Sequence, residues 1–175
     1  MKKQNTEITP DITVHELLNQ YPELEDVLIG IAPPFKKLKN PILRRSVAKI
    51  ATLKQASAVG AVPLTHLVNI LREFVGQPPS QATYEDINYF VEKPGWFDTD
   101  KIALTIDEQT DSKKNEMTLG PILRGAKRLE KGEIIKLKTT FLPAPGIEIM
   151  RSKGYDSWSV RSKGELIFTY FKKNK

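Results

Sequence analysis

The sequence predicts an α+β protein of two small domains, a helical N-terminal domain followed by a C-terminal α/β sandwich. Three observations predict this class. Helix-start signals and apolar residues at helical spacing recur from Thr13 to Gly76. A break rich in proline and glycine follows at 76–80, and beyond residue 101 alternating apolar runs typical of strands are separated by helical ones. The 175 residues suffice for two small cores, which we place at 1–75 and 101–175, with a linker that contains one short helix at 76–100.

About five short helices fit the N-terminal domain. Thr13 and Glu16 have the spacing of a capping box, in which the threonine oxygen accepts a backbone N–H group and the glutamate reaches back to the helix start. Thr52 and Gln55 repeat this spacing. Proline is tolerated in the first helical turn because its missing N–H group has no partner there. The predicted helices therefore begin near Thr13, Pro22, Asn40, Thr52 and Pro63.

The linker contains the predicted short helix and two large aromatic residues. The polar run that begins at Thr83 can cap a helix that contains Ile87 and Phe90 and ends at Pro94. Trp96 and Phe97 follow among acidic residues. An exposed pair of this kind would attract a partner, but such a pair more often fills an interface, so we expect these rings to lie between the two domains.

Beyond the linker the order of elements is βαβαββ. Strands are expected where apolar and polar residues alternate or β-prone residues cluster, at 102–107, 135–141, 158–160 and 166–171. Helices are expected at 121–131 and 143–150, and the first has a basic outer side that includes Arg124, Lys127 and Arg128. Two helices should then cover one face of a mixed four-stranded sheet, as a two-layer sandwich.

The N-terminal half resembles a known family. The segments that carry the resemblance are Ile8 to Leu18 (ITPDITVHELL), Tyr21 to Leu24 (YPEL) and Thr52 to Ala56 (TLKQA). They resemble the small helical domain of unknown function associated with hybrid-cluster and redox-disulfide proteins, which is distantly similar to the N-terminal segment of ScdA-type iron–sulfur repair proteins. The resemblance covers about residues 7–75. It implies a cysteine pair after Gly30, where this chain has Ile-Ala-Pro-Pro-Phe, so the redox role does not carry over.

The C-terminal half resembles a second family. Leu129 to Glu133 (LEKGE), Phe141 to Pro145 (FLPAP) and Ser152 to Trp158 (SKGYDSW) are similar to a family with the TusA-like sulfur-carrier fold, over about residues 101–173. In sulfur carriers a Cys-Pro-x-Pro motif opens the first helix, whose N-terminus lowers the pKa of the thiol. This chain has Met117 to Pro121 (MTLGP) at that place, so persulfide transfer is excluded.

Composition excludes several classes of site. The chain has no cysteine, which rules out disulfides, thiolate metal sites and a cysteine nucleophile. Its only histidines, His15 and His66, lack partners at a ligand spacing, and no phosphate-binding glycine-rich loop occurs. We therefore expect no catalytic residue, no metal and no cofactor. The basic N-terminus has no apolar run behind it, and the run at 27–32 is far too short to span a bilayer, so we expect a cytoplasmic protein without membrane attachment.

Charge points to two candidate binding regions. The net charge is +6, and no acidic residue occurs between Asp26 and Glu73, so the basic block at 36–54 is either a solvated face or a surface for an anionic partner. The helix starts at Gly120 and at Pro143 can present backbone N–H groups to an anion, with arginines near the first. The candidate binding residues are Phe35, Lys36, Lys37, Lys39, Arg44, Arg45, Gly120, Arg124 and Arg128.

The stretch 52–72 also fits a helix-turn-helix, with Gly60 in the turn and the basic block beside it for phosphates. Its second helix offers Thr65, His66 and Asn69 to base edges but little arginine or lysine.

The leading interpretation is a non-catalytic binding or adaptor protein, a cysteine-less relative of redox and sulfur-trafficking modules. Its partner would be a protein or a small anionic ligand. The alternative is a nucleic-acid-binding regulator that uses the hairpin at 52–72, and a third interpretation is an enzyme with its site between the domains. The sequence leaves the oligomeric state open.

Overall fold

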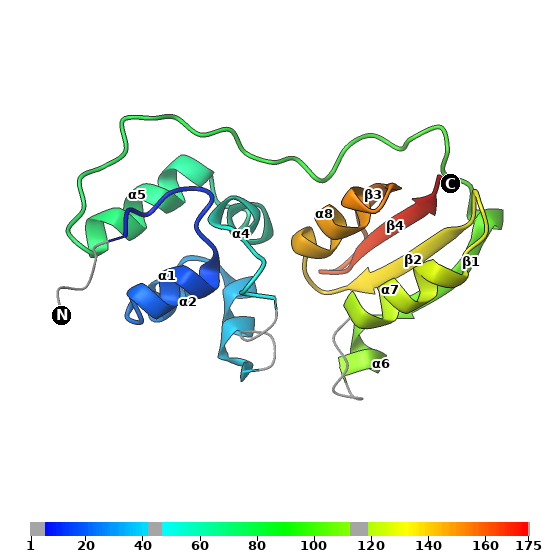
Figure 1. Ribbon diagram of the computed structural model, residues 1–175, viewed down its shortest axis with the longest axis horizontal. Helices are drawn as coiled ribbons and strands as arrows, with labels where there is room; N and C mark the ends of the chain where they lie inside the picture. Colours follow the sequence, from blue (N-terminus) through cyan, green and yellow to red (C-terminus); the bar gives the residue numbers. More distant parts are fainter. Residues whose placement is uncertain (1–5, 42–46, 113–118, 175) are drawn as a thin grey trace. The chain divides into compact units, whose positions relative to one another are not determined.

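The computed structural model describes residues 6–41, 47–112 and 119–174 (Figure 1). The chain divides into two compact units, Met1–Ile87 and Asn88–Lys175. The first unit is helical and the second contains a mixed four-stranded sheet, which confirms the predicted α+β class. Within the described ranges, every helix is too short or too polar to cross a bilayer.

The N-terminal unit contains helices close to four of the five predicted starts. They are α1 (Val14–Gln20), α2 (Leu24–Ile31), α4 (Leu53–Gly60) and α5 (Leu64–Phe74), and a 3-10 helix, η1 (Pro33–Lys39), follows α2. The helix predicted to begin near Asn40 includes residues 42–46, which lie outside the described residues.

Both predicted capping boxes are confirmed. The Glu16 backbone N–H donates to Thr13 Oγ1 (3.1 Å) while the Thr13 N–H donates to Glu16 Oε2 (3.0 Å). Thr52 and Gln55 make the same pair of bonds at 3.3 and 3.1 Å. The two helix starts also meet, because an antiparallel bridge joins Thr13 to Thr52. The N-cap residues of α1 and α4 are thus bonded to each other.

Replacing Thr13 by alanine should lower the free energy of unfolding by about 1 kcal/mol at neutral pH, because the first turn of α1 loses its cap. The Thr13 hydroxyl first, and then its backbone N–H, lower the pKa of Glu16. A carboxylate with a lowered pKa stabilises the fold above its ordinary pKa, and this contribution is lost as the pH falls through the folded-state pKa. The cost of Thr13→Ala should therefore shrink between neutral pH and about pH 3 in urea unfolding followed by circular dichroism.

Thr52→Ala is the matched control for this experiment. Its capping partner, Gln55, does not titrate, so the cost of that substitution should stay constant over the same pH range. Equal pH dependence of the two variants would contradict the assignment to Glu16.

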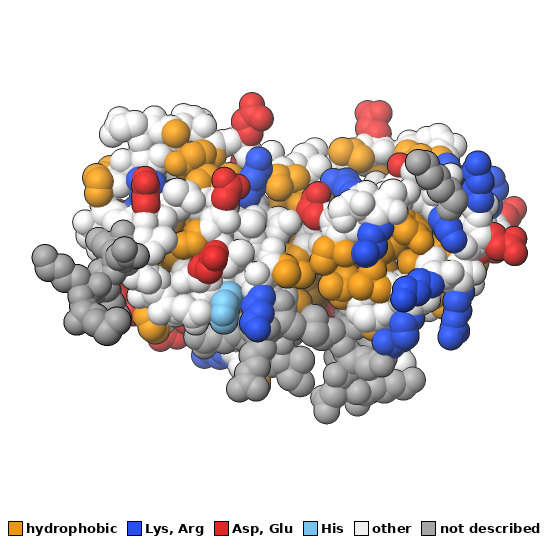
Figure 2. Space-filling view, viewed as in Figure 1, with side chains coloured by type: hydrophobic (Ala, Val, Ile, Leu, Met, Phe, Trp, Pro, Cys, Tyr) orange, Lys and Arg blue, Asp and Glu red, His pale blue; other side chains and the backbone are white. Residues whose placement is uncertain are grey.

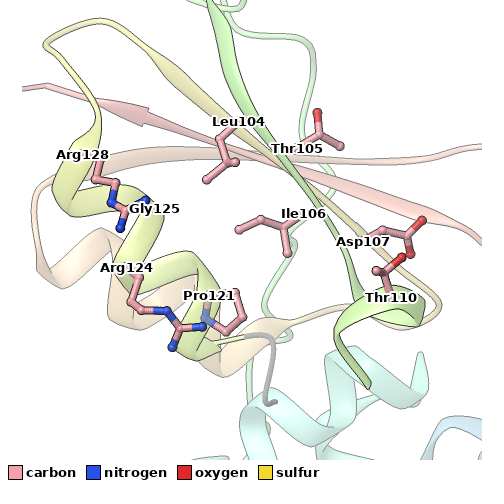
Figure 3. A pocket seen from close by; sticks show the side chains of 9 residues that line it. All are labelled: Leu104, Thr105, Ile106, Asp107, Thr110, Pro121, Arg124, Gly125 and Arg128. Atoms are coloured by element: carbon pink, nitrogen blue, oxygen red, sulfur yellow. The ribbon is translucent and has the colours of Figure 1, made fainter. Parts of the chain in front are cut away.

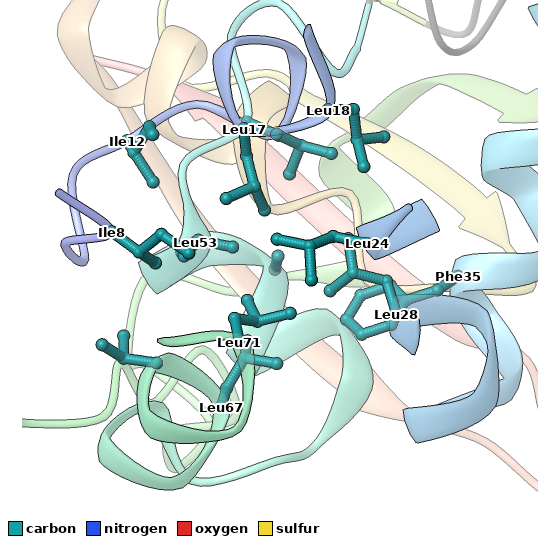
Figure 4. Packing of buried hydrophobic residues seen from close by; sticks show 14 of the residues in the cluster. Ile8, Ile12, Leu17, Leu18, Leu24, Leu28, Phe35, Leu53, Leu67 and Leu71 are labelled. Carbon is teal, nitrogen blue, oxygen red and sulfur yellow. The ribbon is translucent and has the colours of Figure 1, made fainter. Parts of the chain in front are cut away.

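The N-terminal core is formed by leucines and isoleucines from all these elements (Figure 4). Its fully enclosed members are Ile8, Leu17, Leu24, Leu28, Leu53, Leu64, Leu67, Val68 and Leu71. Phe35, from η1, belongs to the same cluster and is only 6% exposed. A Cβ atom on Gly60 would lie 2.8 Å from Phe35 Cζ, so α4 and η1 approach closely only because residue 60 has no side chain.

The helix predicted within the linker is wrong. All residues from Thr83 to Val91 are described, and none of them is helical. The Ser80 N–H donates to Asn69 Oδ1 (2.9 Å), and the Tyr84 N–H donates to Thr65 Oγ1 (2.8 Å). These bonds to side chains of α5 fasten the segment against that helix. The segment therefore runs extended along α5.

Asp86, at the end of this segment, caps α5 from a distance in sequence. Its Oδ1 accepts the Leu64 N–H at 2.7 Å, whereas Pro63, the residue at the helix start, makes no side-chain cap. A carboxylate at a helix N-terminus satisfies an unpaired donor and interacts favourably with the helix dipole.

The C-terminal unit follows the predicted order, with one additional short helix, α6. After a 3-10 turn, η2 (Thr99–Lys101), its elements are β1 (Ile102–Asp107), α6 (Glu108–Ser112), α7 (Leu119–Arg128), β2 (Ile134–Thr139), α8 (Ala144–Ser152), β3 (Tyr155–Arg161) and β4 (Ile167–Lys173). The strand order is β1-β2-β4-β3; β1 and β2 are parallel, and the other two pairs are antiparallel.

One face of this sheet packs against α7. Leu104 of β1 pairs with Ile135 of β2, so both side chains point to the same face. A Cβ atom on Gly125 of α7 would lie 2.3 Å from Leu104 Cδ2 and 3.6 Å from Ile135 Cδ1. Helix and sheet therefore approach closely at this glycine.

The opposite face carries aromatic residues that the chain itself covers. Trp158 of β3 and Tyr170 of β4 are paired in register, and the Phe97 ring lies 4.7 and 4.6 Å from their ring centroids, edge-on to both. The Trp158 Nε1–H donates to the Val91 carbonyl at 3.0 Å. Trp96 packs against the same cluster. The structure thus places the Trp96 and Phe97 rings, which we expected between the domains, on the sheet of their own unit.

Candidate functional site

The described part of the basic block of the N-terminal unit contributes exposed lysines. Lys36 and Lys39 are exposed on η1, and Lys37 is half-buried. Phe35, also predicted as a binding residue, does not present its ring at the surface, because the ring is part of the hydrophobic core. The predicted binding residues Arg44 and Arg45 lie outside the described residues.

The second helix of the possible helix-turn-helix is already engaged within its own unit. The helices α4 and α5 are joined by a three-residue turn that begins at Ala61, whose φ of +53° is left-handed. The side chains of Thr65 and Asn69, which would read bases, accept hydrogen bonds from the segment at 80–84. The geometry therefore offers little support for the nucleic-acid alternative.

Arg72, the arginine on this helix, is turned inward. Its side chain is 6% exposed; Nε donates to the Ile8 carbonyl at 2.8 Å and Nη1 to the Pro78 carbonyl at 3.3 Å. Nη2 forms an ion pair with Glu7 at 2.6 Å. This cation holds the unit together and is not presented to phosphates.

A groove in the C-terminal unit brings two of the predicted residues together (Figure 3). Its volume is about 420 Å³. One wall is α7, through Pro121, Arg124, Gly125 and Arg128, whose spacing puts them on one stripe of the helix. The other wall is β1, through Leu104, Thr105, Ile106 and Asp107, and Thr110 of α6 closes one end. Leu104 and Ile106 point from β1 toward α7, whereas Thr105 points away (Figure 3).

The groove is electrostatically positive. Arg124 and Arg128 are exposed on the same side of α7, and Lys and Arg side chains gather over this region of the surface (Figure 2). The one carboxylate among the lining residues, Asp107, is paired with Lys138 Nζ at 2.9 Å. Its pKa is lowered, first by this bond and then by the Gln109 backbone N–H. Among the described lining residues, the carboxylate is thus paired with a lysine, and the two arginines carry the positive charge.

The other residues predicted near this helix do not line the groove. Gly120 lies one turn before Arg124, and the position of its missing Cβ is 3.4 Å from Arg124 Nη1. Lys127 is exposed outside the lining. Pro143 is buried, also outside the lining, and precedes α8 without capping it through a side chain.

Sequence reasoning missed the apolar and glycine components of the groove. Leu104 and Ile106 read only as alternating strand residues. A glycine in the middle of an amphipathic helix usually has a packing reason, so Gly125 was the available signal. Its spacing from Pro121, Arg124 and Arg128 marks the stripe of α7 that lies next to the strand.

The described part of the chain holds no group of three or more histidine or carboxylate side chains placed to bind a metal ion.

Comparison with known proteins finds a similarity within the N-terminal unit. Residues 8–68 match a family described as domain of unknown function (DUF1858), a match that spans α1 to the first residues of α5. No curated protein and no solved structure matches the chain. Part of the N-terminal unit is thus similar to a domain of unknown function.

Proposed function

We propose that the protein is a non-catalytic binding or adaptor protein whose groove between α7 and β1 receives an anionic group of a protein or small-ligand partner. One observation carries this proposal. Arg124 and Arg128 stand one turn apart on the same wall, while the one carboxylate among the described lining residues, that of Asp107, is paired with Lys138. Among the described lining residues, an anion would therefore meet two arginines and a carboxylate that is already paired with a lysine.

The chemistry of the lining suits binding. A guanidinium group donates two parallel hydrogen bonds to a carboxylate or a phosphate, which fixes orientation as well as charge. Leu104 and Ile106 supply the apolar surface that ligand sites commonly combine with a few polar groups. The described lining residues are two threonines, one aspartate and two arginines besides apolar residues and glycine. Among them is no histidine or lysine that could serve as a base for a hydroxyl nucleophile.

The proposal includes a relationship of the C-terminal unit to the sulfur-carrier fold. The order βαβαββ, with α7 connecting the parallel strands β1 and β2, supports it. The groove also lies along α7, the helix that begins within the sequence Met117 to Pro121, where sulfur carriers have their cysteine motif. On this proposal the unit has kept a ligand site beside that helix without the thiol chemistry.

Titration of ¹⁵N-labelled protein with citrate and with inorganic phosphate tests this function. Isolated anions of this size should bind with a Kd of about 1 mM and shift the amide signals of β1 and α7. Arg124→Glu combined with Arg128→Glu should weaken binding at least about tenfold, since both attractive charges are reversed. Binding should also weaken as salt is added.

The control is Lys127→Glu combined with Lys153→Glu, which changes the net charge equally at two exposed positions outside the lining. It should leave the affinity within about twofold of the wild type. Equal losses in the two double variants, or shifts outside the groove, would show that anions respond only to the overall charge and would refute the site.

A further inference from the structure

The groove has a second property, because one of its walls is a free edge of the sheet. β1 pairs with β2 on one side, and no strand of the described residues pairs with its other side. An unpaired edge presents a row of N–H and C=O groups to which another strand can bond. A register shift interrupts the pairing with β2 between Ile102 and Leu104, and from Leu104 to Asp107 the register is regular. The regular part of the edge is the part that lines the groove.

This edge lacks the usual protection against pairing. Edge strands are commonly protected by proline, or by lysine and other charged residues. The sequence of β1, Ile-Ala-Leu-Thr-Ile-Asp, contains no lysine or proline, and its single charge is at the last position. The opposite edge strand, β3, carries charges at Asp156 and Arg161. Ala103 and Thr105 are exposed, so β1 is accessible to solvent at these two positions.

The arginines on the other wall have the spacing of a strand. Arg124 and Arg128 are four residues apart on α7, and four residues of α-helix rise about 6 Å. Alternate residues of a strand are separated by about 6.6–6.8 Å and point to the same face. The helix runs alongside β1 (Figure 3). An extended chain bonded to β1 could therefore present two successive same-face side chains to the two guanidinium groups.

We propose that the occupant of the groove is an extended acidic peptide segment of a partner protein, which adds to the sheet beside β1 and places alternate carboxylates against Arg124 and Arg128. This inference rests on the proposed function, because it uses the same groove and the same two arginines. The occupant is a peptide because a small anion would contact the arginines and leave the backbone groups of the β1 edge unpaired. Main-chain bonds supply affinity in this mode of recognition, and alternate side chains supply specificity.

The test begins with selection of binders from a random library of displayed peptides about 10 residues long, the upper length of common strands. The full chain is the bait. The selected peptides should carry Asp or Glu at alternate positions, and the best of them is then synthesised. Arg124→Glu combined with Arg128→Glu should weaken its binding at least about tenfold, whereas Lys127→Glu combined with Lys153→Glu should not.

Backbone methylation of the synthetic peptide tests strand addition without altering the protein. In a strand, amide groups point alternately toward and away from the neighbouring edge, so methylation of one alternate set of amides removes the bonds to β1. That peptide should lose at least about tenfold in affinity, and the peptide methylated on the other set should not. Hydrogen exchange of the β1 amides should slow when the unmethylated peptide binds.

The outcomes separate this inference from the proposed function. If both methylated peptides bind equally, if the binders are not acidic, or if the arginine variant binds them normally, strand addition is wrong. If citrate and phosphate bind at the groove while no acidic peptide is selected, the peptide inference fails and the anion-binding function stands. If neither the anions nor a peptide binds there, both fail.

Discussion

Replacement of Phe35 by alanine is expected to destabilise the N-terminal unit by about 3–5 kcal/mol, the usual cost of removing a buried phenylalanine ring. The ring is 6% exposed and lies in a core cluster against Ala32 and Gly60. Its removal loses apolar burial and leaves a cavity, because α4 and η1 can close only partly over the space. Urea unfolding followed by circular dichroism measures the change.

Neighbouring substitutions serve as controls for this prediction. Phe35→Leu keeps much of the volume and should cost about 1–2 kcal/mol, which keeps the measurement possible if the alanine variant does not fold. Lys36→Ala and Lys39→Ala remove exposed side chains from the same 3-10 helix and should change stability by less than about 0.5 kcal/mol. A cost below about 1 kcal/mol for Phe35→Ala would show that the ring is not part of the core and would restore its interpretation as a binding residue.

Arg72→Ala is expected to cost about 2–4 kcal/mol, because a buried guanidinium with three partners is lost. The Ile8 carbonyl would lose the hydrogen bond from Nε, and the Pro78 carbonyl would lose the hydrogen bond from Nη1. The ion pair with Glu7 contributes less, since the glutamate side chain is 70% exposed and solvent weakens the attraction. These bonds join the N-terminal segment, α5 and the segment after it, so their loss should lower the cooperativity of unfolding as well.

Two further variants separate geometry from charge. Arg72→Lys keeps the charge but lacks the fork that reaches three acceptors, so it should recover less than half of the lost stability. Glu7→Gln should cost less than about 1 kcal/mol. If Arg72→Ala left the stability unchanged and weakened binding to duplex DNA, Arg72 would be a phosphate contact and the helix-turn-helix alternative would regain its support.

The sequence alone determined the features that depend on residues close together in the chain. The capping boxes at Thr13 and Thr52 have both partners within three residues, and the order βαβαββ follows from alternation and helical spacing within each element. The same local patterns singled out Arg124 and Arg128 on the basic side of α7. Such signals are readable because hydrogen-bonding partners and side-chain faces repeat at fixed short intervals.

The tertiary structure decided what depends on distant partners. The segment after Gly76 carries helix-forming signals, yet its donors bond to Thr65 and Asn69, and Asp86 caps a helix 22 residues before it. Phe35 stands next to lysines in the sequence but lies in the core.

The groove likewise exists only because Gly125 brings α7 close to Leu104, about 20 residues earlier in the chain. The physical reason is the same at each of these places. A residue's burial and its bonds are set by whichever surface the folded chain brings against it, and local spacing carries no information about that surface.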